Sequence, residues 1–298
     1  MTTWQAIILG IVQGLTEFIP ISSTAHLVFT ARALGLYQGV DKTLQAEQTT
    51  ATMAVIQLGT LLAVLSYFAN DILNITVAFV RDHLALIRNK PASSNPNFSR
   101  LSRDAWLGWF VVVGSIPVAV VGLVFKKEIE GSFTKNLWVI ATMMIVVALL
   151  LAIAEALGKR NRTMAQLGFR DAIAVGLAQV LALIPGSSRS GSTIMGGLFV
   201  GETRETAARF SFLLSIPAIA ASGLLELTEA MAKLPSGSYG ALTVATIVSG
   251  VVGYASIWFL LRFLRTNSTA IFIAYRMVVG GLILFLLFRG YIASGDVN

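Results

Sequence analysis

One apolar segment of this chain is interrupted by polar residues, and it occurs a second time 166 positions later. The first copy runs from Ala6 to His26 as AIILGIVQGLTEFIPISSTAH, and the second runs from Ala172 to Gly191 as AIAVGLAQVLALIPGSSRSG. Both copies end in Ile-Pro followed by a serine pair, with one residue deleted in the second copy. A repeated and broken apolar segment is typical of membrane proteins that build one site between two internal repeats.

The composition places the chain in a membrane. It has 298 residues, of which 55% are hydrophobic and 12% are charged, and the mean hydropathy is +0.76. Soluble domains carry about 25% charged residues. The absence of cysteine excludes disulfides and thiolate metal sites, so a metal would rest on oxygen ligands. The net charge of +7 lies mainly in short loops, and we expect no nucleic-acid partner.

Six stretches come close to the roughly 20 apolar residues that a spanning helix needs. They are Thr50–Phe68 (with an optional continuation to Val80), Trp106–Phe125, Leu137–Leu157, Phe210–Leu227, Leu242–Leu261 and Ala270–Phe288. The two repeated segments are too short. Each is predicted to form two half-helices around a polar turn, as a re-entrant hairpin: Trp4–Ile19 with Leu27–Leu36, and Ala172–Ile184 with Thr193–Val200.

Loop charges orient these elements. With six spans and two non-crossing hairpins, the basic loops share one side, which the positive-inside rule makes cytoplasmic. Their residues are Arg81, Arg88, Lys90, Arg100, Arg103, Lys159, Arg160, Arg162, Arg170, Arg204, Arg262 and Arg265. The loops Lys126–Lys135 and Lys233–Gly240 and both termini then face outward, and Pro91–Ser99 is a surface loop. The hairpins enter from opposite sides, so a single transmembrane domain would consist of inverted repeats, residues 1–158 and 165–298.

The polar turns are suited to binding an anion. Ser22, Ser23 and Thr24 follow Pro20, and the alignment pairs Ser22-Ser23 with Ser187-Ser188, followed by Arg189, Ser190 and Gly191. Unpaired N–H groups at a helix N-terminus attract anions, and the planar fork of Arg189 fits phosphate. The alternative is that the serines only satisfy the broken helices and that Arg189 pairs with a carboxylate.

Four further residues carry candidate chemistry or charge. Gln13 and Glu17 lie on one helical face, and a carboxylate beside a phosphate site suggests a bridging divalent cation, Mg²⁺ or Ca²⁺; a structural hydrogen bond is the alternative for Glu17. His26 follows the serines by three or four positions, which suits acid–base chemistry, although it could be an ordinary helix residue. Arg276, inside the last span, could snorkel or pair with an acid and is assigned no role in chemistry.

These motifs resemble the undecaprenyl-pyrophosphate phosphatase family of the bacitracin-resistance type. The family pattern of an E/Q-x-x-x-E pair followed by P-x-S-S-T-x-H is matched from Gln13 to His26, and P-G-x-S-R-S-G is matched from Pro185 to Gly191. The resemblance implies removal of the terminal phosphate from a C55 isoprenyl pyrophosphate with a divalent cation. It also implies that Glu17, Ser23, His26 and Arg189 form the core site. Gln13 departs from the glutamate that many members carry, which weakens its assignment as a metal ligand.

The sequence therefore predicts an all-α, multi-pass protein of the bacterial plasma membrane. We expect a phosphatase whose site faces outward, with Ser23 as nucleophile or with direct attack by water. A flippase for polyprenyl phosphate is the main alternative, and a lipid-binding scaffold without catalysis is a third. The predicted partner is a long-chain isoprenyl pyrophosphate, and a homodimer remains open beside a monomer.

Overall fold

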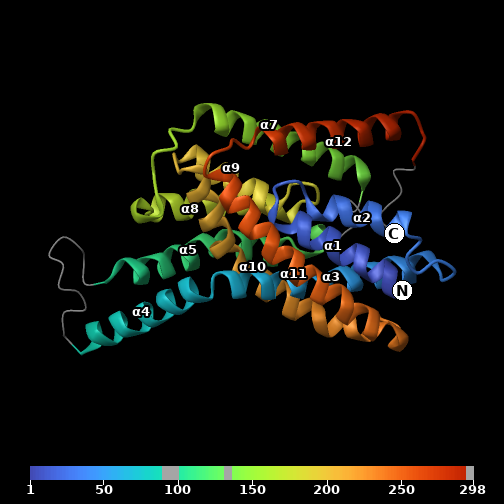
Figure 1. Cartoon of the computed structure of the whole chain (residues 1–298), viewed down its shortest axis with the longest axis horizontal. Helices are drawn as coiled ribbons and strands as arrows, with labels where there is room; N and C mark the ends of the chain where they lie inside the picture. The colour runs from blue at the N-terminus through green and yellow to red at the C-terminus, as the bar shows by residue number, and fades with distance from the viewer. Residues whose placement is uncertain (89–100, 131–135, 293–298) are drawn as a thin grey trace.

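The protein is built from helices, and its long helices lie roughly along the longest axis of the molecule at differing tilts (Figure 1). The computed structural model describes residues 1–88, 101–130 and 136–292. Six of its helices are long and apolar enough to cross a membrane. They are α3 (Lys42–Tyr67), α5 (Arg103–Val124), α7 (Leu137–Leu157), α10 (Arg204–Lys233), α11 (Tyr239–Leu264) and α12 (Ala270–Phe288). The prediction of an all-α chain with six candidate spans is confirmed.

The predicted span boundaries agree best with the observed helices where the apolar run is uninterrupted. α7 and α12 begin and end at the predicted residues. The continuation of the first span to Val80 is a separate helix, α4 (Ala69–Ile87), because Phe68 leaves the helical conformation. The short helix α6 (Lys126–Glu130) follows α5. The predicted loop Pro91–Ser99 lies outside the described residues, as do residues 131–135 of the loop Lys126–Lys135.

The six long helices present apolar side chains on their outer faces. Leu123, Val251 and Phe288 are 75%, 67% and 81% exposed. Exposed apolar surface on this scale is costly in water and favourable against lipid tails. The chain is therefore a multi-pass membrane protein.

Each repeated segment forms a pair of short helices that folds back on itself. The first pair is α1 (Thr3–Phe18) and α2 (Ser23–Ala33), and its outer ends are joined by a hydrogen bond from the Gln5 side chain to the Leu34 carbonyl oxygen, 2.9 Å. The second pair is α8 (Phe169–Val180), extended by a 3₁₀ turn, and α9 (Arg189–Phe199). At its outer end, the segment before α8 meets the segment after α9. The backbone N–H groups of Asn161 and Arg162 both donate to the Gly201 carbonyl oxygen at 3.0 Å.

The two helical pairs enter the bundle from opposite ends (Figure 1). α2 packs against the first turns of α7 and the last turns of α12, whereas α9 packs against α10 and the last turns of α7. α1 lies mainly along α11, and α8 lies mainly along α5, so each pair packs on a helix of the other half of the chain. This arrangement brings the two turns together in the middle of the bundle.

The second helix of each pair begins four residues earlier than predicted. α2 begins at Ser23 rather than Leu27, and α9 begins at Arg189 rather than Thr193. Apolar periodicity cannot detect this start because the first helical turn carries the polar residues of the motif. Those residues are consequently held on helix N-termini rather than in loops.

Candidate active site between the two helical turns

The residues before α2 and α9 share an uncommon backbone conformation. Ser22 has φ of 78° and Ser188 has φ of 66°, and each is the N-cap of its helix. Residues with side chains rarely adopt positive φ, and such strain concentrates at functional sites. Ser22 is therefore equivalent to Ser188, which corrects the sequence alignment by one residue. The equivalent first helical residues are Ser23 and Arg189.

Gly186 allows the second turn to lie against α7. It adopts φ of +94°, and a Cβ atom there would lie 2.1 Å from the Ile140 carbonyl oxygen. A side chain is excluded both by conformation and by space. The Pro-Gly of the motif therefore fixes the depth at which Ser188 and Arg189 sit.

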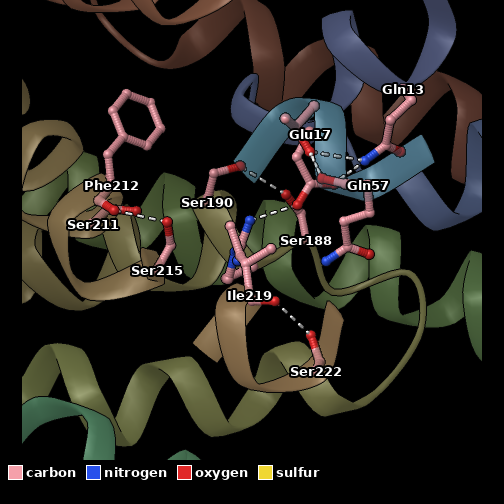
Figure 2. A network of polar contacts seen from close by, with 12 residues as sticks. Gln13, Glu17, Gln57, Ser188, Ser190, Ser211, Phe212, Ser215, Ile219 and Ser222 are labelled. Atoms are coloured by element: carbon pink, nitrogen blue, oxygen red, sulfur yellow. Dashed lines mark hydrogen bonds and ion pairs between the residues drawn. The ribbon is translucent and has the colours of Figure 1, made fainter. Parts of the chain in front are cut away.

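The two turns are joined by an ion pair. Arg189 Nη2 donates to Glu17 Oε1 at 2.5 Å, across 172 positions of sequence. The other carboxylate oxygen of Glu17 accepts from Gln13 Nε2 at 3.1 Å. Figure 2 shows Gln13, Glu17 and Gln57 on one side and Ser188 and Ser190 approaching from the other. Pairing of Arg189 with a carboxylate, one of the alternatives, is the arrangement that the structure contains.

His26 is held by both of its ring nitrogens. Nδ1 lies 2.7 Å from the Ser22 carbonyl oxygen and Nε2 lies 2.6 Å from the Tyr275 hydroxyl. A carbonyl oxygen can only accept, so Nδ1 carries a proton, and in the neutral ring the lone pair is at Nε2. The described contacts do not bring His26 onto the Ser23 hydroxyl. The ring stacks on Tyr275 with centroids 5.6 Å apart.

The remaining candidate residues differ in accessibility. Ser23 and Ser188 are half-buried and Thr24 is exposed. Ser187, Ser190 and Gly191 are buried, and Ser187 Oγ has no hydrogen-bond partner. Ser188 Oγ accepts from the Gly191 N–H and contacts Ser190 Oγ at 3.2 Å. α2 has no side-chain cap, so its first N–H groups are free to face an anion.

Two residues of α12 belong to this site although no motif marked them. Tyr275 contacts His26, and Arg276 is fully buried against both turns. The expectation that Arg276 snorkels or pairs with an acid is wrong, because its hydrogen bonds go to backbone carbonyl oxygens. An intramembrane arginine is itself a signal of function.

The donor set fits a divalent cation only together with a phosphate. No group of three or more His, Asp or Glu that could hold a metal forms within residues 1–88, 101–130 and 136–292. Glu17 and the Gln13 amide provide one carboxylate and one neutral oxygen. Mg²⁺ is commonly bound by one or two carboxylates plus substrate phosphate oxygens. A substrate-bridged ion therefore fits these residues, and a site made of protein ligands alone does not.

A cavity of about 710 Å³ lies elsewhere and includes none of these residues. It is lined by several arginines, of which Arg209 pairs with Asp71 and Arg265 pairs with Glu205. Arginines neutralised in this way attract an anion weakly. The helical turns remain the stronger candidate.

Comparison with known proteins identifies the family of this chain. The sequence profile of the family described as bacitracin resistance protein BacA matches residues 6–282. The chain belongs to the BacA family. It is 50% identical over 289 residues to an undecaprenyl-diphosphatase of Syntrophobacter fumaroxidans, covering 97% of this chain and 99% of the relative. A second undecaprenyl-diphosphatase, from Mycolicibacterium gilvum, is 42% identical over 297 residues, covering 99% and 100%. Both relatives match this BacA-family chain almost from end to end.

Proposed function

We propose that this BacA-family chain hydrolyses undecaprenyl pyrophosphate to undecaprenyl monophosphate and inorganic phosphate. Support comes from relatives at 42–50% identity that bear the name undecaprenyl-diphosphatase. The reaction would return the lipid carrier for cell-wall synthesis, which agrees with a family described by bacitracin resistance. The observation that carries the assignment to a site is the contact between Glu17, in the last turn of α1, and Arg189, the first residue of α9.

The terminal phosphate would bind between the two turns. Arg189 uses one terminal nitrogen on Glu17, and a guanidinium has further donors for phosphate oxygens. The first N–H groups of α2 and α9 add donors and the positive ends of two helix dipoles. A divalent cation, Mg²⁺ or Ca²⁺, would be held by Glu17 with assistance from Gln13, and it would neutralise charge on the pyrophosphate.

Ser23 is the proposed nucleophile because it is half-buried at the first position of α2, the position equivalent to that of Arg189 in α9. Its oxygen would attack the terminal phosphorus, the bond from that phosphorus to the bridging oxygen would break, and the lipid monophosphate would leave. His26 Nε2 would take the hydroxyl proton after exchanging its Tyr275 contact. Water would then hydrolyse the phosphoserine. Direct attack by water on the pyrophosphate is the alternative, and mass spectrometry of a rapidly quenched reaction would find phosphate on Ser23 only in the first case.

The decisive test is release of inorganic phosphate from a long-chain isoprenyl pyrophosphate by the purified protein, with and without a chelator. We expect release that stops when the chelator is added. A protein that binds this lipid and releases no phosphate in the presence of Mg²⁺ or Ca²⁺ would contradict the phosphatase assignment.

A flippase is the second candidate, and a specific observation favours it. Helical pairs that enter from opposite ends and meet in the middle are typical of transporters built from inverted repeats. The same purified protein in lipid vesicles separates the two functions. Movement of labelled polyprenyl phosphate across the vesicle bilayer without phosphate release would support transport alone.

We further propose that both helical pairs are re-entrant and that the site opens to the outer side of the plasma membrane. The basic residues of the loops favour this orientation. Because the chain has no cysteine, single cysteines test it. In intact cells, an impermeant reagent should label Gly237→Cys but not Asn161→Cys, two exposed positions of opposite loops. The reverse pattern would place the loops the other way round.

A further inference from the structure

Arg276 lies in the middle of α12 with none of its surface exposed. It forms no ion pair with a carboxylate in the described part of the chain. Its Nε donates to the Met144 carbonyl oxygen of α7 at 3.1 Å, and Nη2 lies 3.3 Å from that of Met143. The other contacts are to the two turns: the carbonyl oxygens of Pro20 at 3.4 Å, Gly186 at 3.0 Å and Ser187 at 3.0 Å.

These contacts join the first turn to the second. The carbonyl groups where a helix is broken lose their helical partners and need donors when they are buried. Arg276 supplies donors to one such oxygen of the first turn and to two of the second. A fully buried guanidinium is costly unless many dipoles face it. If Arg276 served only to join α12 to α7, its contacts with the Met143 and Met144 carbonyl oxygens would be sufficient.

The contacts also set the direction of groups that face the substrate. The carbonyl and the following N–H of a trans peptide point in opposite directions. The Ser187 carbonyl faces Arg276, so the Ser188 N–H faces the other way. Arg276 Nη1 also lies beside the first turn of α9, since a Cβ on Gly191 would be 3.4 Å from it. The opposite charges of Glu17 and Arg189 neutralise each other. The positive charge of Arg276 therefore remains to attract an anion between the turns.

We propose that Arg276 is a positioning residue for phosphate hydrolysis. By binding carbonyl oxygens of both turns it holds Ser23 and Arg189 in one geometry, and it does so without touching the substrate. This inference rests on the proposed function, which assigns those two residues to the reaction. It assigns to α12 a role that the sequence motifs do not contain.

The test compares Arg276→Lys with Arg209→Lys. Arg209 is a matched control because it is an interhelical arginine, paired with Asp71 at 2.7 Å, that contacts neither turn. A lysine at 276 keeps the charge but has one nitrogen instead of a fork. We expect kcat for long-chain isoprenyl pyrophosphate to fall on the order of 100-fold, as misplacement of catalytic groups by about 1 Å does. KM should stay within about threefold, because phosphate contacts are kept.

A second readout does not depend on activity. Hydrogen–deuterium exchange followed by mass spectrometry should show faster exchange in both turns, residues 19–24 and 184–190, in Arg276→Lys but not in Arg209→Lys. Faster exchange confined to α7 and α12, or normal kcat in folded Arg276→Lys, would overturn the proposal.

Two outcomes separate this inference from its premise. If wild-type protein releases no phosphate, the proposed function fails, whereas the exchange experiment still tests the link between the turns. If Arg276→Lys does not fold, Arg276→Gln takes its place, since its amide keeps one donor group without the charge. Failure of both variants to fold would show that Arg276 is required for the fold rather than for positioning, and would overturn the proposal.

Discussion

Replacing Arg189 by lysine should reduce hydrolysis strongly while the protein stays folded. Arg189 is 16% exposed and donates to Glu17 at 2.5 Å. A phosphate between the turns needs donors from the same guanidinium at the same time. Lysine keeps the charge but offers one nitrogen, so at least one charge-assisted hydrogen bond is lost, which costs about 1.5–3 kcal/mol. That loss corresponds to a decrease in kcat/KM of about 10-fold to about 150-fold.

The assay is phosphate release from a long-chain isoprenyl pyrophosphate in detergent, with thermal unfolding measured on the same samples. Arg209→Lys is again the control, because its partner Asp71 lies outside the site. Activity of Arg189→Lys within about twofold of wild type would mean that no bidentate contact with phosphate exists. Arg189 would then serve only to hold Glu17.

Three further predictions concern contacts and charges around the helical pairs. Glu17→Gln keeps the shape but not the charge, so phosphate release should fall on the order of 1,000-fold, and rescue by excess Mg²⁺ would contradict a charge-dependent role. Tyr275→Phe removes only the hydroxyl at His26 Nε2; kcat/KM should fall by about tenfold with a changed pH profile, and an unchanged profile would contradict positioning of His26. Burial, and next the neighbouring Asp171, raise the pKa of Glu202 to about 8, from 4.5. The folded state therefore holds a proton that the unfolded state loses as the pH rises from about 4.5 to 8, so stability should decrease over that range. Glu202→Gln should flatten this decrease in the thermal midpoint, and an unaltered slope would show that Glu202 is ionised in the folded state.

Most of the fold could be predicted because apolar runs of about 20 residues have few alternatives in a membrane. α7 and α12 match their predicted bounds for this reason. The start of α2 could not be predicted from apolar periodicity. The helix begins after Ser22 because this residue adopts a positive φ, and apart from the motif nothing in the sequence indicates that conformation. The hydrogen-bond partners of Arg276 could not be predicted either, because every residue has a backbone carbonyl oxygen and the sequence does not distinguish among them. A search for side-chain partners therefore led to the wrong expectation for Arg276.

Pairing Ser22 with Ser188 changes the roles assigned to the two copies of the repeat. If Ser22 and Ser188 are equivalent N-caps, then the first helical position holds Ser23 in one copy and Arg189 in the other. These positions lie at the positive ends of two helices that approach from opposite sides, which is where an anion gains most from both dipoles. One copy of the repeat can carry a nucleophilic hydroxyl or a guanidinium at its first helical position, but not both. Duplication of the broken helix provides two such positions around one phosphate, and a buried arginine from a third helix, α12, contacts both turns.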